Sequence, residues 1–416
     1  MSYMCRIIMD LIHGTRETSK FAPQDFISNM PDNVITNILD RLPLQDAVRT
    51  NVLSRNWRFK WTMLSQLVLD YDFFKYLLEI EDISNHAKII SSIFLQLRGA
   101  ITTCVLSVNN VLDVEDINHW ISFLSRNEIK NLTLGTVGSS LLYKLPTHLF
   151  SCLGLKHLKL LNCLIHLPTT FHGFPNLLSL ELCQIQFEVG KFGEFITRCP
   201  VLENLKMGVF YDPERKVKPD EIAKLANVKT LSLCLCIVEN MTITSSTTIF
   251  ELLGNLPQLQ ELDLDFRDRG VIEGGAKKRF PTAFACLRAL KLSRIDLSNG
   301  TVLSCVFEII RQLPNLQTLE IIATSVSNVG PTPAICSPDV DYNTMGPLQL
   351  RSVGFIDLKG SENEVCLITC LLGCSPFLKR IGIRPHKSLA RDEQLMFDSK
   401  LLKLQRAYPV VAINLY

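Results

Sequence analysis

The chain of 416 residues is 47% hydrophobic, and its 43 basic and 41 acidic side chains give a formal net charge of +2. That size allows a large core and two or three domains, unless repeats lengthen one structure unit by unit. The balanced charge provides no field for a polyanion, which argues against a nucleic acid partner. No apolar run approaches the roughly 18 residues that span a bilayer, which argues against a membrane segment.

The 14 cysteines follow neither a disulfide nor a zinc pattern. The closest are Cys234 and Cys236 and the run Cys366, Cys370 and Cys374, without a CxxC pair or zinc-spaced histidines. Because cysteine also packs as a small apolar side chain, we expect reduced thiols, no metal and no cofactor. Reduced thiols are typical of the nucleus and the cytoplasm, where we expect this protein.

The first 24 residues carry no regular pattern. Arg6 and Asp10 interrupt the apolar opening MSYMCRIIMDLIHG, which argues against the apolar core of a signal peptide. We expect residues 1–24 to form a poorly ordered leader.

The next stretch predicts a first short helix. Pro31 and Asp32 are favourable at a helix start, and Pro43 ends the helix. Between them lies a broad apolar stripe at helical spacing, formed by Val34, Ile35, Ile38, Leu39 and Leu42.

Two more short helices are expected to follow. One runs from about Leu44 to Val52, with Ala47, Val48 and Val52 inward. Ser54 can cap another, which would place Trp57 and Trp61 on one face. Such small helices cannot bury all these side chains against one another, so the excess needs the adjoining repeats or a partner protein.

This segment resembles the F-box. The matching positions are Asp25, Ile27, Ser28, Pro31, Asp32, Ile38, Leu39, Leu42, Pro43, Ala47, Thr50, Leu53, Ser54, Trp57 and Trp61. The F-box of the family docks on a Skp-type adaptor. The resemblance implies that the residues facing the adaptor include Pro31, Ile35, Leu39, Leu42, Pro43, Leu44, Leu53 and Trp57. We expect Trp61 to face the first repeat, at MLSQLVLD, although either tryptophan could lie wholly in the core.

Most of the remaining chain repeats one apolar spacing, L-x-x-L-x-L. The middle residues of these units are Leu132, Leu158, Leu180, Leu205, Leu231, Leu262, Leu290, Leu319, Val353 and Ile381. The steps between them run from 22 to 34 residues. This spacing, repeated at such a period, is typical of leucine-rich repeats. Alternate strand residues face opposite sides, and no unit buries its apolar side alone, so the units must stack.

The predicted fold is therefore α/β: a leucine-rich-repeat solenoid preceded by a small three-helix F-box. Parallel strands form one wall, and helices or loops form the other. FGEFIT, before Pro200, and VFEIIRQ, before Pro314, have helical spacing and are expected on that other wall.

Each predicted strand also places one residue on its exposed face, between the last two apolar positions. The charged members of this row are Lys159, Glu181, Lys206, Asp263, Lys291 and Glu320, and the row ends with Gly354 and Gly382. The signs alternate, which does not suit a phosphate ligand. We expect the six charged residues to bind a target protein, the alternative being a solvated face of balanced charge.

Three inserts interrupt the repeats, at 208–221, 267–280 and 324–347. The second carries Lys277, Lys278 and Arg279, which suit an acidic partner, and does not match the phosphate-binding GxxxxGK[ST]. No catalytic motif such as GxSxG occurs, so we expect a non-catalytic protein.

The C-terminal stretches LRSVGFIDLKGSENEVCLITCLLGCSPFLKRIGI and KLLKLQRAYPVVAINLY resemble the FBD segment. They predict two further strand units with a helix around Leu367 to Leu372. The chain then resembles plant F-box proteins with leucine-rich repeats and a C-terminal FBD segment. The expected organisation is a leader (1–24), an F-box (25–65), leucine-rich repeats (66–335) and FBD-like repeats (336–416).

This resemblance implies a substrate-recognition subunit of a Skp–cullin–F-box ubiquitin ligase. The F-box would dock on the adaptor, which bridges to a cullin-RING ligase, while the repeats hold a target for ubiquitination. The alternative is a non-catalytic leucine-rich-repeat scaffold that does not assemble with a cullin.

Overall fold

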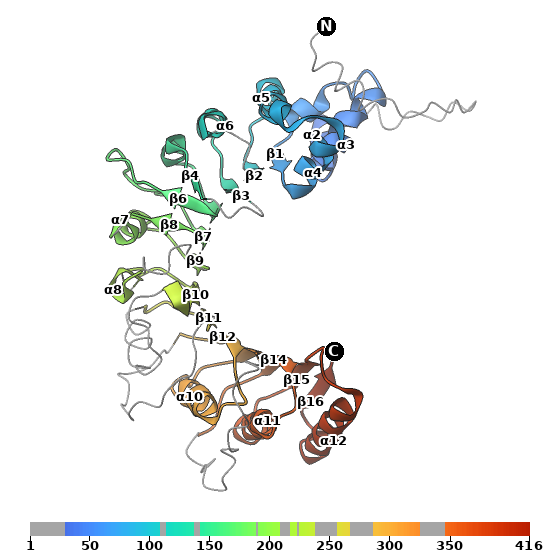
Figure 1. Cartoon of the computed structure of the whole chain (residues 1–416), viewed down its shortest axis with the longest axis vertical. Helices are drawn as coiled ribbons and strands as arrows, with labels where there is room; N and C mark the ends of the chain where they lie inside the picture. The colour runs from blue at the N-terminus through green and yellow to red at the C-terminus, as the bar shows by residue number, and fades with distance from the viewer. Residues whose placement is uncertain are drawn as a thin grey trace, which may run out of the picture. The chain divides into compact units, whose positions relative to one another are not determined.

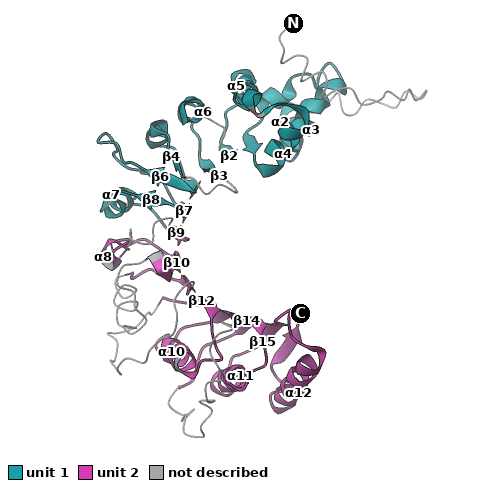
Figure 2. Cartoon of the chain, viewed as in Figure 1, with its two compact units in different colours: residues 1–202 teal, residues 203–416 magenta. Residues whose placement is uncertain are grey.

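The computed structural model describes residues 30–108, 114–136, 142–188, 190–208, 217–222, 224–237, 256–266, 286–324 and 346–416 (Figure 1). The expected leader, the F-box positions Asp25, Ile27 and Ser28, and the basic residues Lys277, Lys278 and Arg279 lie outside these ranges, as do most of the other two inserts. The chain divides into two compact units, Met1–Leu202 and Glu203–Tyr416 (Figure 2).

The F-box segment at the start of the first unit forms four short helical elements. They are α2 (Asp32–Leu39), α3 (Leu44–Arg49) and the 3₁₀ helices η1 (Thr50–Val52) and η2 (Lys60–Met63). Pro31 and Pro43 stand immediately before α2 and α3. Proline suits this position because the first N–H groups of a helix have no intrahelical acceptor.

The predicted third F-box helix is wrong. Residues 55–59 form turns, and Phe59 has a left-handed backbone with φ of 64°, which no α-helix can pass through. The Phe59 N–H donates instead to Oδ1 of Asn51, at 2.7 Å. Trp57 and Trp61 therefore do not share a helix face, although both are buried.

The helices that follow in the first unit cover its repeats. They are α4 (Tyr71–Ile80), η3 (Ile83–Asn85), α5 (His86–Gln96), α6 (Val114–Arg126), η4 (Thr147–Ser151) and α7 (Lys191–Thr197). Asp70 caps α4 by accepting a hydrogen bond from the N–H of Phe73, at 3.1 Å. α7 confirms the helix predicted at FGEFIT.

One parallel sheet in the first unit carries the repeat strands. Its strands are β1 (Gln66–Leu69), β2 (Thr103–Val108), β3 (Asn131–Thr136), β5 (His157–Leu161) and β7 (Ser179–Cys183), hydrogen-bonded in that order. Leu132, Leu158 and Leu180 lie opposite one another across β3, β5 and β7, as one row of buried side chains.

A second, short parallel sheet and a phenylalanine cluster complete this unit. The sheet consists of β4 (Tyr143–Lys144), β6 (Cys163–Ile165) and β8 (Gln186–Phe187). Phe171 packs edge-on against Phe174 and stacks on Phe195 of α7. Aromatic packing therefore fills the repeat interior beneath α7.

The second unit continues the same pattern. Its strands are β9 (Asn204–Met207), β10 (Thr230–Cys234), β11 (Glu261–Asp265), β12 (Ala289–Ile295), β13 (Thr318–Ala323), β14 (Ser352–Leu358), β15 (Arg380–Pro385) and β16 (Ala412–Leu415). Its helices are α8 (Pro219–Ile222), η5 (Leu235–Ile237), α10 (Gly300–Arg311), α11 (Glu362–Cys374) and α12 (Arg391–Ala407). α10 and α11 confirm the helices predicted at VFEIIRQ and around Leu367 to Leu372.

The repeat prediction is confirmed at the level of register. Each of the ten predicted middle residues is the second residue of its strand, and the pairings between neighbouring strands within each unit align one middle residue with the next. Four repeats also turn through a left-handed residue four positions after the middle one: Asn162, Gln184, Arg294 and Asp357. One local geometry thus recurs after these strands, as expected when one structural unit is repeated.

Three strands of the repeat sheets lie beyond the predicted ten: β1, which lies in the expected first repeat at MLSQLVLD, β2 and β16. Their aligned residues are Leu67, Cys104 and Ile413. Cys104 occupies a leucine position, and it is fully buried, as an apolar residue would be. The spacing was therefore present in Ile101, Cys104 and Leu106, but with cysteine at its centre.

Candidate functional site

Four of the eight residues expected to face the adaptor belong instead to the F-box core. Ile35, Leu39, Leu44 and Trp57 are buried, with only 3% of Trp57 exposed. This corrects the expectation for these four residues, because a buried side chain offers no surface to a partner. The other four, Pro31, Leu42, Pro43 and Leu53, are exposed.

The F-box also leaves large apolar side chains in solvent, which we call the apolar F-box surface. Its residues are Val34, Ile38, Leu42, Val52, Leu53, Phe59 and Met63. Val52 is 57% exposed and Leu53 54%, so the expected inward orientation of Val52 is wrong. The elements that carry these residues adjoin: Lys60 Nζ lies 2.6 Å from Asp32 Oδ1, and Phe59 bonds Asn51.

The broad stripe of the first helix explains this surface. Ile35 and Leu39, four residues apart, form its buried row, while Val34, Ile38 and Leu42 form a second row in solvent. Side chains four apart on a helix share a face, so α2 presents one row inward and one outward. The outer row was visible in the sequence, but nothing in the spacing indicates which of two adjacent rows is buried.

The F-box is joined firmly to the first repeat. The carboxylate of Asp40 accepts hydrogen bonds from the N–H and hydroxyl of Ser65, at 2.9 and 2.6 Å, just before β1. The carbonyl of Thr62 accepts from the N–H groups of Arg98 and Gly99. A Cβ on Gly99 would lie 2.8 Å from the backbone of Met63, so this close approach requires glycine.

The six charged residues predicted to contact a target all lie on the exposed side of their strands. Four of them form ion pairs across neighbouring strands. Lys159 Nζ lies 3.0 Å from Glu181 Oε1, and Lys291 Nζ lies 2.7 Å from Glu320 Oε1. The alternating signs therefore serve, at least in part, to neutralise adjacent strands.

Asp263 lies between two serine hydroxyls in the same row. Ser232 and Ser293 both donate to its carboxylate, at 3.1 and 3.4 Å. Burial between strands raises the pKa of Asp263 above its ordinary value, while the hydrogen bond from Ser232 and the charge of Lys291 lower it.

The cysteines in the described part of the chain form no disulfide, and most of their side chains are buried or partly buried. Burial raises the pKa of Cys104 and Cys163 to about 12, so both stay protonated. The Sγ atoms of Cys234 and Cys236 lie 3.0 Å apart, and this contact, together with burial, raises the pKa of Cys234. Protonated, shielded thiols are poor nucleophiles.

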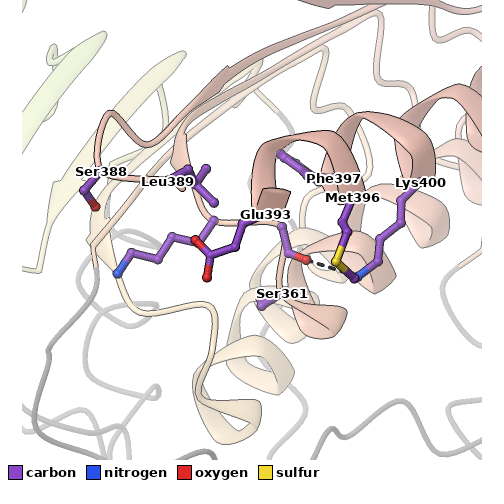
Figure 3. A pocket seen from close by; sticks show the side chains of 9 residues that line it. Ser361, Ser388, Leu389, Glu393, Met396, Phe397 and Lys400 are labelled. Carbon is purple, nitrogen blue, oxygen red and sulfur yellow. Dashed lines mark hydrogen bonds between the residues drawn. The ribbon is translucent and has the colours of Figure 1, made fainter. Parts of the chain in front are cut away.

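A cavity of about 330 Å³ lies near the starts of α11 and α12 (Figure 3). Its lining residues are Lys359, Gly360, Ser361, Ser388, Leu389, Glu393, Met396, Phe397 and Lys400. Lys400 donates to Glu362 at 2.6 Å and to the carbonyl of Gly360 at 3.3 Å. Glu393 accepts from the N–H of Ala390 at 3.1 Å. Because these charged groups already hydrogen-bond within the chain, we interpret the cavity as part of the packing between α11 and α12 rather than as a binding site.

Within the described ranges, no cluster of three histidine, cysteine, aspartate or glutamate side chains could hold a metal ion. None of the helices described is long and apolar enough to cross a membrane.

Two family models match the chain. Residues 27–68 match the F-box domain, and residues 117–215 match the leucine-rich repeats of FBD-associated F-box protein At5g56370. With the F-box helices and the parallel repeat strands, these matches indicate an F-box domain followed by leucine-rich repeats.

The chain is similar to F-box/FBD/LRR-repeat proteins of plants. It is 29% identical over 411 residues to F-box/FBD/LRR-repeat protein At1g13570 of Arabidopsis thaliana, covering 92% of this chain and 97% of that protein. It is 26% identical to F-box protein At1g80960 of the same species, covering 94% and 90% of the two chains.

A chain from the crystal structure of the yeast Rad7–Elc1 complex is similar at 12% identity and a TM-score of 0.37, with 87% of this chain and 90% of that one covered. At that score the likeness supports no conclusion about function.

Proposed function

We propose that this protein is the substrate-recognition subunit of a Skp–cullin–F-box ubiquitin ligase. The F-box docks on a Skp-type adaptor, which connects it to a cullin-RING ligase, and the repeats hold a target protein for ubiquitination. The observation that carries this proposal is the apolar F-box surface, seven large apolar side chains exposed on about 30 residues of chain.

Clustered apolar side chains at a surface are costly in water and mark a site that a partner covers. Leu53 and Val52 are more than half exposed, while the F-box core beneath them is already filled by Leu39 and Trp57. Docking an adaptor here would therefore bury apolar area without rearranging that core. Pro31, Leu42, Pro43 and Leu53, from the set implied by the F-box resemblance, are exposed with this surface.

The target is proposed to contact the exposed sheet faces, including Lys159, Glu181, Lys206, Asp263, Lys291 and Glu320. Charges arranged in alternating pairs favour a partner of complementary pattern over partners of one sign. Such contacts contribute specificity more than affinity, since an exposed ion pair is already solvated and screened.

The protein is proposed to be non-catalytic, and to act in the nucleus or the cytoplasm without a nucleic acid or membrane partner. Its family matches are to an adaptor-docking domain and to repeats, and its buried thiols are protonated. The chemistry of ubiquitin transfer would come from other subunits of the ligase.

The test is binding of the full chain to a purified Skp-type adaptor, measured by calorimetry. The Val52→Asp, Leu53→Asp variant should bind the adaptor roughly tenfold more weakly or worse, because two charges would have to be buried in an apolar contact. Its thermal unfolding should be unchanged, since both side chains are exposed.

A matched control is Leu95→Asp, because Leu95 is 85% exposed on α5 and outside the F-box. It should bind the adaptor as the native chain does. Equal binding by the F-box variant would refute the placement of the adaptor. No binding by the native chain would refute the receptor proposal and favour a scaffold that does not assemble with a cullin.

A further inference from the structure

The exposed sheet face at the C-terminal end of the second unit differs in charge from the faces before it. Residues 346–416 contain ten basic and six acidic side chains, a net charge of +4, whereas the whole chain carries +2. Arg351, Lys379, Arg380, Arg384 and Lys387 are all exposed around β14 and β15. None of these five has an ion pair within the described ranges.

Arg380 and Arg384 form the centre of this basic area. Both are exposed on β15, where the alternating burial of the strand places them on the same face, opposite the buried Ile381 and Ile383. The Nε of Arg380 donates to the hydroxyl of Ser352 at 3.0 Å, which orients that guanidinium. The remaining N–H groups can then serve a bidentate partner.

On the β14 side, a glycine leaves the space beside the two arginines open. Gly382 stands between them on β15, and Gly354 is aligned with Gly382 on β14. A Cβ on Gly354 would meet only the Glu320 side chain, at 3.6 Å, an ordinary contact. Glu320 is itself held by Lys291, at 2.7 Å, and so does not neutralise the arginines.

Apolar groups border the same face. Ile356 of β14 is aligned with Arg384, and it is part-exposed on the arginine side of the sheet. The ring of Tyr416 lies beside Gly382, where a Cβ would come within 3.1 Å of it, and is itself largely exposed. A ligand that reaches both arginines would therefore also contact an aliphatic and an aromatic side chain.

We propose that the β15 arginine face binds an extended acidic segment of a partner protein. Two carboxylates of that segment pair with Arg380 and Arg384, and the residues between them lie over Gly354 and the ring of Tyr416, which occupies the space above Gly382. Four residues of extended chain span about 13 Å, so the two acidic residues of the ligand are four positions apart. Bidentate guanidinium–carboxylate pairs give this recognition its spacing as well as its charge.

This inference rests on the proposed function, because it names the chemistry of the target that the receptor would hold. It depends on neither the adaptor nor the cullin, so its test is independent of theirs. If the adaptor fails to bind, the receptor proposal is refuted, but the proposal for the β15 arginine face is not affected.

The test is fluorescence anisotropy of the full chain with labelled synthetic peptides. One peptide has two glutamates four positions apart between threonines and valines. A second has the same composition with the glutamates adjacent, and a third replaces both with glutamine. The first should bind most tightly, and added salt should weaken it.

The deciding variant is Arg380→Glu, Arg384→Glu, which should weaken binding of the first peptide roughly tenfold or more, through repulsion in place of attraction. The control is Lys403→Glu, Arg406→Glu, the same change of charge at two exposed positions on α12. It should bind like the native chain, and both variants should keep the native unfolding temperature.

Three results would overturn the proposal. Equal binding by the arginine variant and the native chain would place the peptide elsewhere. Equal weakening of peptide binding in the α12 control would show that the effect comes from the overall charge of the protein. Equal affinity for the three peptides would show that the site does not recognise two carboxylates at this spacing.

Discussion

The repeat sheets bury their apolar side chains, whereas the F-box leaves many of its apolar side chains exposed. In the repeats, the strand leucines are buried almost completely, as at Leu160 with no exposed area. In the F-box, α2 buries one row of its stripe and leaves the next in solvent, and Leu53 is 54% exposed. A strand divides its residues between two faces, so the apolar set goes inside and the polar set outside. A short helix can carry two apolar rows, one for its own core and one for a partner.

The same contrast holds for charges. The exposed faces of β5, β7, β12 and β13 hold charged side chains that pair across strands, as Lys159 does with Glu181. In the F-box, Asp40 is instead used internally, to hold the segment that leads into β1. The repeat faces therefore expose charged side chains and the F-box exposes apolar side chains, so mutations in the two regions should have different effects.

The largest expected difference is between two Leu→Ala changes. Leu160→Ala should lower the free energy of unfolding by roughly 2–5 kcal/mol, because it leaves a cavity in a packed core. Leu53→Ala should change it by about 0.5 kcal/mol or less, because this side chain is already exposed. Urea unfolding of the full chain, followed by circular dichroism, measures both free energies of unfolding. Similar losses in the two variants would contradict the proposed difference between the F-box and the repeats.

The next effect concerns the joint between the two regions. Asp40→Asn should cost about 1–3 kcal/mol, because the hydrogen bonds from Ser65 lose their charged acceptor. Hydrogen exchange at the amides of Ser65 and Gln66 should accelerate. Asp46→Asn is the matched control, since Asp46 forms only an exposed ion pair with Arg49, at 2.9 Å. Unchanged exchange in the Asp40 variant would show that other contacts hold the joint.

A pH effect distinguishes a buried carboxyl group from the exposed ones. Burial raises the pKa of Glu364 in α11 above its ordinary value of 4.5, against the hydrogen bonds from Ser361 and Lys359. Between 4.5 and the raised pKa, the folded chain binds more protons than the unfolded chain. The free energy of unfolding should therefore fall as pH rises through this window, by at most about 1.4 kcal/mol per pH unit.

Glu364→Gln should remove that part of the slope, and Glu362→Gln, at an exposed position of the same helix, should keep it. Thermal unfolding at a series of pH values makes the comparison. An unchanged slope in the Glu364 variant would mean that its carboxyl titrates alike in both states.

The smallest expected effect is at the repeat face. A double-mutant cycle of Lys291→Ala and Glu320→Ala should give a coupling energy of about 0–1 kcal/mol, as is usual for exposed ion pairs. A larger value would make the pair part of the scaffold and weaken its assignment to a target surface.

The repeat spacing was enough to predict ten strands and their register. A period of two specifies which side chains are buried, and shifting a strand by one residue would expose all of its leucines. The spacing was weakest where another residue took a leucine position, as Cys104 does in β2. The same spacing runs through Val410, Ile413 and Leu415 at β16, but Val410 is exposed there.

The F-box shows where such inference ends. Its local pattern predicted α2, α3 and the prolines before them, because the prolines and the helical spacing act within a few residues. It predicted a third helix that Phe59 interrupts, and it assigned Ile35, Leu39, Leu44 and Trp57 to a partner. Which apolar row turns inward depends on contacts between residues far apart in the chain, such as Asp32 with Lys60 and Asp40 with Ser65. Local spacing carries no information about those contacts, so packing alone selected the surface that remains exposed.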